Sequence, residues 1–312
     1  MITGVKTSAS VSALDGKITI TGIGKGDANT FNTLNHGVNL TAATVLTSGM
    51  GNIEINGTGG SGDNTNMGVN ITNNTLIQTP SGHIKLIGQG GGSASFNCGV
   101  RIDGRGKVRA TNDGLITVTG NGGGINRLNY GVSISGDLSE ISVVDGALNI
   151  TGNAAGNLDK NSGVSIETGA CIISTGLGTI DIAGTAPLEG QNKNMGIFLS
   201  GEDTIITSVK GNITMSGTGN ELGGNNQGVR LESSTISSTG AGVDAATITI
   251  NGWGGLGPDA NYGIYLTDYA SITSLDGDIN VTGNSNVSGT VGVENRGDIS
   301  SANGHVLIIS NN

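Results

Sequence analysis

The chain has 312 residues, of which 58 are glycine and only 3 are proline, whereas glycine makes up roughly 7% of an average protein. Charged residues contribute 12% and apolar residues 35%, a balance that excludes collagen, a proline-rich linker and a highly charged disordered chain. The net charge of -10 argues against nucleic-acid binding, which needs a basic surface. No apolar run approaches the roughly 20 residues of a membrane span, so we expect no membrane insertion.

A repeated motif runs along the sequence. It consists of a glycine, then Val or Ile, then any residue, then an apolar residue. From the weak copy at Gly4 to the weak copy at Gly292 there are nine intervals, which gives a mean period of 32 residues. A constant period of this size is typical of proteins built from stacked structural repeats. The clear copies begin at Gly37, Gly68, Gly99, Gly131, Gly163, Gly196, Gly228 and Gly263.

Each repeat contains three short β-prone segments in which apolar and polar residues alternate, so one set of side chains shares one face. In the first segment the apolar pairs are Val38/Leu40, Val69/Ile71, Val100/Ile102, Val132/Ile134, Val164/Ile166, Ile197/Leu199, Val229/Leu231 and Ile264/Leu266. The second segment offers mainly one inward apolar residue, such as Leu76, Val108, Ile172 or Ile272. In the third segment the pairs are Ile18/Ile20, Ile53/Ile55, Ile84/Leu86, Ile116/Val118, Leu148/Ile150, Ile180/Ile182, Ile213/Met215, Ile248/Ile250, Ile279/Val281 and Val306/Ile308.

These segments predict an all-β fold, a right-handed single-stranded parallel β-helix with three strands per coil and about ten coils of about 32 residues. A propeller blade would need a fourth strand, and a leucine-rich repeat would need a helical segment and its own leucine spacing. We expect residues 1–312 to form one continuous β-helix. We also expect this β-helix to be a segment of a longer repeat protein or a subunit that stacks end to end.

An Asn-x-Gly motif precedes the first strand on eight consecutive coils. Amide side chains stacked one strand spacing apart can hydrogen-bond along the axis. The motif therefore predicts a structural asparagine ladder rather than a ligand site. The ladder consists of Asn35, Asn66, Asn97, Asn129, Asn161, Asn194, Asn226 and Asn261.

The outward positions of the first strand include Phe198, Arg230 and Tyr265 on successive coils. An aromatic and guanidinium strip of this kind is a candidate contact surface for a glycan or a protein receptor. Stacking between coils for stability is the alternative explanation for the same residues.

Two other functions are compatible with particular side chains. Asp113 and Asp145 occupy the same turn slot on adjacent coils, where a pair of carboxylates would suit a polysaccharide lyase or hydrolase, but Asp-Gly is also a favoured turn sequence. Outward threonines such as Thr117 and Thr119 would suit an ice-binding solenoid, although threonine is also simply a good strand former. We expect no catalytic residues and no enzymatic activity.

The remaining reactive side chains do not form a pattern that indicates chemistry. The histidines His36, His83 and His305 lie far apart, and we expect them to be solvated turn residues without a metal. Cys98 and Cys171 fall in different turns, so we expect buried or half-buried free thiols. No cofactor is expected.

The recurring Gly-Val-x-Ile motif, followed by segments such as Ile18-Thr19-Ile20-Thr21-Gly22, resembles the β-strand repeat regions of very large bacterial surface and secreted proteins. These are the filamentous-haemagglutinin-like adhesins and the autotransporter passengers. The resemblance implies an extracellular or cell-surface location and a role in adhesion or as a rigid spacer. With it we expect a non-enzymatic structural or adhesive protein that can self-associate end to end and contact a glycan or protein receptor.

Overall fold

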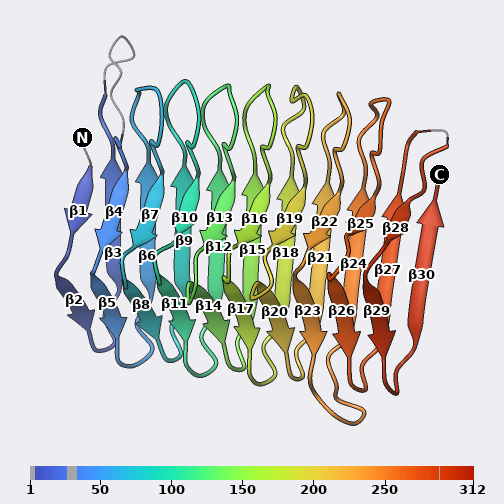
Figure 1. Cartoon of the computed structure of the whole chain (residues 1–312). Coiled ribbons are helices and arrows are strands. Elements are labelled where there is room, and N and C mark those ends of the chain that lie inside the picture. The colour runs from blue at the N-terminus through green and yellow to red at the C-terminus, as the bar shows by residue number, and fades with distance from the viewer. Residues whose placement is uncertain (1–3, 27–33, 288) are drawn as a thin grey trace.

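The computed structural model describes residues 4–26, 34–287 and 289–312. These residues form thirty β-strands and no helix, wound into a right-handed solenoid with three parallel strands in each coil. Figure 1 shows the coils stacked side by side from the N-terminus to the C-terminus. The predicted fold class is therefore confirmed.

The strands belong to three ten-stranded parallel sheets, which we call A, B and C. Sheet A contains β1 (Val5–Thr7), β4 (Val38–Thr41), β7 (Val69–Thr72), β10 (Val100–Ile102), β13 (Val132–Ser135), β16 (Val164–Glu167), β19 (Ile197–Ser200), β22 (Val229–Glu232), β25 (Ile264–Leu266) and β28 (Val293–Asn295). Sheet B contains β2 (Ser10–Ala13), β5 (Thr44–Thr47), β8 (Leu76–Thr79), β11 (Lys107–Ala110), β14 (Glu140–Val143), β17 (Cys171–Ser174), β20 (Ile205–Ser208), β23 (Thr235–Ser238), β26 (Ser271–Ser274) and β29 (Asp298–Ser301). Sheet C contains β3 (Ile18–Ile23), β6 (Ile53–Thr58), β9 (Ile84–Gln89), β12 (Ile116–Asn121), β15 (Leu148–Asn153), β18 (Ile180–Thr185), β21 (Ile213–Thr218), β24 (Ile248–Trp253), β27 (Ile279–Asn284) and β30 (Val306–Asn311).

Equivalent apolar residues lie directly over one another inside the solenoid. Ile116 pairs with Ile84 in the preceding coil and with Leu148 in the next. Ile116, Ile180 and Ile248 are all completely buried, as the period of 32 residues predicts. Because each strand contributes the same inward positions, the buried core continues from coil to coil between Ile18 and Val281. The predicted inward pair of the last coil, Val306 and Ile308 in β30, is instead 40% and 44% exposed.

The predicted inward residue of one sheet B strand is wrong. In β8 it is Ile77 that is fully buried, while Leu76 lies at an outward, half-buried position. The register explains this, because Ile77 pairs with Val45 on one side and Val108 on the other. Two adjacent apolar residues carry no alternation of their own, so the neighbouring coils decide which of them faces the core.

A close approach of the backbone closes each Gly-rich loop, the segment between a sheet C strand and the next sheet A strand. A Cβ atom added to Gly120 would lie 2.0 Å from the carbonyl oxygen of Gly131. The chain that leaves β12 and the chain that enters β13 can therefore pass each other only without side chains. The same contact recurs between Gly57 and Gly68, which explains the two glycines that flank each loop.

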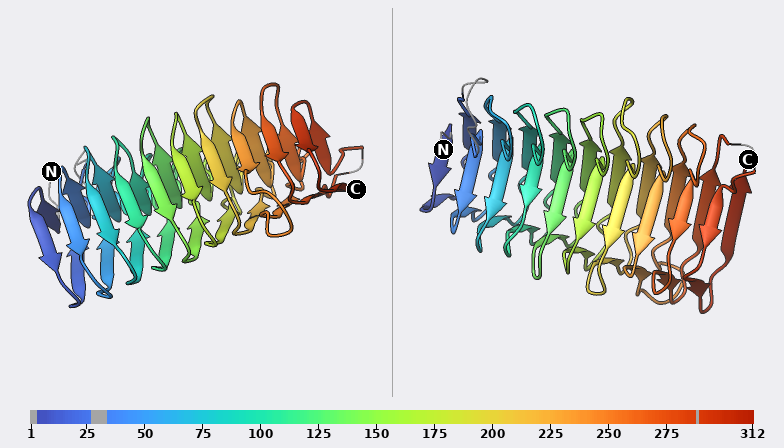
Figure 2. Two further views of the ribbon diagram at one scale, coloured as in Figure 1. Left: turned by 90° about the horizontal axis from the view of Figure 1, so that it is seen from below. Right: turned by 45° about the horizontal axis from the view of Figure 1, so that its top comes forward.

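Figure 2 shows a rod with the two termini at opposite ends and the Gly-rich loops along one side. Ten strands at about 4.8 Å spacing give about 43 Å between the first and last strand of a sheet. Within the described ranges, no helix is present that could cross a lipid bilayer.

Candidate functional site

The asparagine ladder joins eight coils through bonds between side chain and backbone. In every step the backbone N–H of one ladder asparagine donates to Oδ1 of the equivalent asparagine in the next coil, over 2.7–3.0 Å. All eight residues are fully buried. The predicted bond from amide to amide along the axis is present between Asn66 and Asn97, where Nδ2 of Asn66 also donates to Oδ1 of Asn97 at 3.1 Å.

The side-chain amides of the ladder also hold the Gly-rich loops. Nδ2 of Asn129 donates to the carbonyl oxygen of Ala94 at 2.9 Å, and Nδ2 of Asn97 donates to that of Asp63 at 3.0 Å. Each such asparagine bonds its own loop to the neighbouring coil. The ladder is thus placed inside the wall of the rod, where a ligand does not reach it.

The residue before each ladder asparagine adopts a left-handed backbone conformation, which the sequence analysis did not predict. Its φ is positive on all eight coils although none of these residues is glycine. Such a conformation is unfavourable for residues with a Cβ, and here the ladder bonds stabilise it. The eight are Leu34, Thr65, Phe96, Leu128, Lys160, Lys193, Asn225 and Ala260.

The outer face of sheet A is recessed rather than freely exposed. Its central column contains Asn70, Ser133 and Ser165, which are only 8%, 7% and 1% exposed although they point away from the core. Side chains from the middle of the Asn-x-Gly motif, such as Met67 and Met195, are buried as well. The predicted contact strip lies in this column, so its side chains are half-buried instead of fully solvent-facing.

The structure brings Phe198, Arg230 and Tyr265 together as successive neighbours in sheet A. The guanidinium carbon of Arg230 lies 5.2 Å from the centroid of the Tyr265 ring, and Arg230 also forms an ion pair with Glu232. The Arg230–Tyr265 half of the strip therefore carries the cation–π stacking between coils that the sequence analysis considered.

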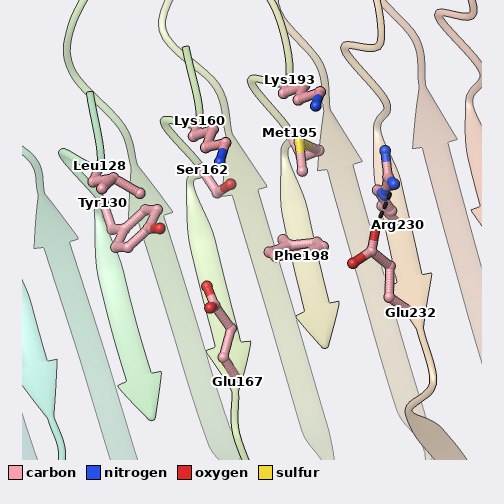
Figure 3. Close-up of a pocket in the computed structure, with 10 residues that line it drawn as sticks. All are labelled: Leu128, Tyr130, Lys160, Ser162, Glu167, Lys193, Met195, Phe198, Arg230 and Glu232. Carbon is pink, nitrogen blue, oxygen red and sulfur yellow. Dashed lines mark ion pairs between the residues drawn. The ribbon is translucent and has the colours of Figure 1, made fainter. Parts of the chain in front are cut away.

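Phe198 is in a different position. Among the described residues its ring has neither an aromatic nor a cation–π partner, and it lines a groove of about 310 Å³ on the outer face of sheet A. Figure 3 shows the groove crossing β13, β16, β19 and β22. Its residues are Leu128, Tyr130, Lys160, Ser162, Glu167, Lys193, Met195, Phe198, Arg230 and Glu232.

A hydrogen-bonded group fixes one wall of this groove. Ser165, beneath the groove, donates to the carboxylate of Glu167 and is also hydrogen-bonded to Tyr130. Burial raises the pKa of the Tyr130 phenol above its usual range, with a further contribution from the Glu167 charge. Tyr130 therefore stays neutral, and its ring and hydroxyl are held in place at the edge of the groove (Figure 3).

The acidic pair singled out in the sequence is not in this groove. Asp113 and Asp145 are exposed and lie in the turns between sheets B and C. There the carboxylate of Asp145 accepts the backbone N–H of Leu177 at 2.9 Å, and that of Asp15 accepts the N–H of Met50 in the same way. These contacts are those of a turn residue that ties one coil to the next.

The groove does contain two other carboxylates, which the sequence analysis missed. Glu167 and Glu232 end their strands two coils apart, with Ser200 in register between them, so their Cα atoms are separated by about 9.6 Å. One feature of the sequence could have indicated them: each glutamate follows the outward residue of its first strand by two positions, and Asp103 occupies the same place in its own coil. Arg101 and Asp103 form an ion pair like that of Arg230 and Glu232.

The prediction for the histidines is wrong for His36. It is only 3% exposed, and its Nδ1 accepts the backbone N–H of Met67 at 3.2 Å. Burial, reinforced by the Arg101 charge, lowers the pKa of His36 to about 4. His83 is half-buried and bonded to Thr117, while His305 is exposed. The prediction failed for His36 because its position in the Asn-x-Gly motif faces the recessed side of sheet A, where Met67 and Met195 are buried as well.

The described residues offer neither a cluster of metal ligands nor an activated thiol. In the described parts of the chain, no three His, Cys, Asp or Glu side chains are grouped as metal ligands. Cys98 is buried and Cys171 is half-buried, and both are free thiols as expected. Burial raises the pKa of the Cys98 thiol to about 11.

The outer face of sheet C holds the threonines considered for ice binding. Thr117 and Thr119 lie there, but Lys85 pairs with Thr117 in the preceding coil and Asn149 in the next. Charged and amide side chains therefore interrupt the array. Thermal hysteresis stays the test of that hypothesis.

The chain matches no protein-family model, no curated protein and no solved structure. The fold is thus established by the strand pairing itself. The resemblance to bacterial surface repeats is carried by the sequence motifs.

Proposed function

We propose that this chain is a non-enzymatic, rigid β-solenoid of a bacterial cell surface or extracellular filament, where it holds a contact surface at a fixed distance. The single observation that carries this proposal is the in-register pairing of all ten coils in three sheets. A rod with one uninterrupted core resists bending between coils, because any bend must open strand pairs in at least one sheet.

The surface of the rod supports a contact role in addition to a spacer role. The face of sheet A carries the groove that contains Phe198 and the neighbouring charged side chains, whereas the asparagine ladder and the turn aspartates serve the fold. The motif resemblance to adhesin repeats is what supports the extracellular location.

Small-angle scattering and negative-stain electron microscopy of the purified chain test the rod. We expect a stiff particle with a length of about 43 Å or more, and longer rods at high concentration if copies stack end to end. A compact globule or a flexible string of coils would contradict the proposal. Immunogold labelling of the producing bacterium tests the location, and label confined to the cytoplasm would contradict it.

Carbohydrate processing is the second candidate, and one observation favours it. Glu167, Glu232 and Arg230 line the same groove. The strand spacing places the Cα atoms of the two glutamates about 9.6 Å apart, while an inverting glycosidase holds its two carboxyl groups about 6.5–9.5 Å apart. However, Glu232 forms an ion pair with Arg230, and Glu167 accepts a hydrogen bond from Ser165. Neither carboxylate is therefore free to act as an acid or base. Release of reducing or unsaturated sugar ends from polysaccharides, abolished by E167Q or E232Q, would favour the enzyme.

A further inference from the structure

The groove around Phe198 combines an apolar floor with charged groups on its rim. Leu128, Met195 and Phe198 supply the apolar surface, and Lys160 and Lys193 stand on neighbouring coils above it (Figure 3). Its volume of about 310 Å³ lies at the lower end of the range for small-ligand sites. A ligand that fits must therefore offer a flat apolar face and several polar groups around it.

Some charged side chains of the groove form ion pairs and others do not. Arg230 and Glu232 neutralise each other in an ion pair, and Glu167 accepts from Ser165. Within the described residues, Lys160 and Lys193 take part in no ion pair, and both are exposed. Three basic and two acidic side chains line the groove, so its formal charge is about +1. In a chain with a net charge of -10, this local excess and the two lysines that form no ion pair favour a ligand with a negative group.

The surroundings exclude other ligand classes. A peptide strand cannot add to the sheet here, because β16 and β19 are each paired on both sides. A lipid chain would have to bury the charged groups of the rim. A nucleic acid would need many more cations than two lysines.

From these observations we propose that the groove binds an acidic oligosaccharide, with one sugar ring stacked on Phe198 and a carboxylate or sulfate group beside Lys160 and Lys193. A pyranose ring offers a C–H face to an aromatic side chain and hydroxyls that both donate and accept hydrogen bonds. Glu167 and Arg230 stand where such hydroxyls would lie. This inference rests on the contact role in the proposed function and names its ligand.

Isothermal titration calorimetry with three probes tests it: hexagalacturonate carries carboxylates, a heparin hexasaccharide carries sulfates as well, and maltohexaose is neutral. We expect at least one acidic probe to bind with a dissociation constant below about 1 mM, about tenfold more tightly than maltohexaose and less tightly at high salt. The acidic probe that binds better identifies the charged group.

Two sets of variants locate the site. Phe198→Ala is expected to weaken binding about tenfold through loss of stacking, and the pair Lys160→Ala and Lys193→Ala about fivefold. The matched controls are Tyr269→Ala, an aromatic residue that is 88% exposed outside the groove, and the pair Lys85→Ala and Lys107→Ala on the other two sheets. The lysine variants are on the surface, so they keep the test valid if Phe198→Ala unfolds the rod.

Equal or tighter binding of maltohexaose, no saturable binding of any probe, or binding that the groove variants do not weaken more than the controls would each overturn the inference. Small-angle scattering from the same samples shows whether the particle is a rod, and so distinguishes failure of the ligand inference from failure of the proposed function. A stiff rod that binds no sugar refutes only the ligand, while a particle that is not a rod refutes the wider proposal.

Discussion

The Oδ1 atom of Asn129 lies 2.9 Å from the backbone nitrogen of Asn97 one coil away, and it accepts the hydrogen bond of a fully buried N–H group. Through Nδ2 the same side chain donates to the carbonyl oxygen of Ala94 at 2.9 Å. One asparagine thus pairs a buried backbone N–H and a half-buried loop carbonyl. The N–H to Oδ1 bond repeats from coil to coil, which explains why asparagine recurs on eight coils.

Replacing Asn129 with Ala leaves the buried N–H of Asn97 without a partner, whereas the carbonyl oxygen of Ala94 keeps the backbone N–H of Asn126 at 3.1 Å. One unpaired buried group costs about 1–3 kcal/mol, so we expect the free energy of unfolding to fall by about 1–3 kcal/mol. Guanidinium titration followed by circular dichroism measures it. Asn149→Ala, at an outward half-buried position of β15, is the control and should change stability by less than about 0.5 kcal/mol. Equal effects of the two substitutions would show that the ladder is not a source of stability.

Gly120→Ala tests the close approach at the base of the Gly-rich loop. The added methyl group would lie 2.0 Å from the carbonyl oxygen of Gly131, so the two chain segments must separate. We expect a loss of about 2–3 kcal/mol or more in thermal or chemical unfolding. Gly16→Ala is the matched control, because its added Cβ meets only the Cβ of Ala13 at 3.7 Å. A Gly120 variant as stable as the Gly16 variant would mean that the loop can widen freely.

The core could be predicted from the sequence because one period fixes it. Once equivalent residues lie one coil apart, as Ile116 does with Leu148, alternation alone tells inside from outside. Where two apolar residues are adjacent, as Leu76 and Ile77 are, alternation does not tell which of them faces the core. The register with the neighbouring coils determines it. Local pattern fails wherever the deciding contact lies in another coil.

The groove could be predicted only in part, for a related reason. The sequence places Phe198 and Arg230 on one face, which the structure shows as well. The sequence does not show that Tyr130 and Met195, which come from a different position of the repeat, lie beside that face and make it concave. The position of Glu167 in the repeat is visible in the sequence, but its contact with Ser165, and through Ser165 with Tyr130 of the preceding coil, is not.

The two thiols are expected to differ in reactivity. Burial raises the pKa of Cys98 to about 11 and, with the charges of Glu140 and Asp203, also raises that of Cys171. Since the thiolate is the reactive form, at pH 8 a disulfide reagent should modify Cys171 more slowly than free cysteine and Cys98 only after unfolding. Absorbance of the released thiol follows both. Cys171→Ala should abolish the native reaction, and rapid modification of that variant would contradict the burial of Cys98.

Buried His36 makes stability depend on pH. Its folded pKa is about 4, below the ordinary value of 6.5, so as the pH falls from 6.5 to 4 the unfolded chain takes up a proton that the folded chain refuses. The free energy of unfolding should therefore fall by up to about 3 kcal/mol over this range. His36→Gln should remove that loss, since Gln227 is fully buried at the equivalent position, and the carboxylates titrate alike in both proteins. Denaturant titrations at several pH values measure it, with the exposed His305→Gln as control. If His36→Gln and the unaltered chain lose stability in parallel, His36 is not the group responsible.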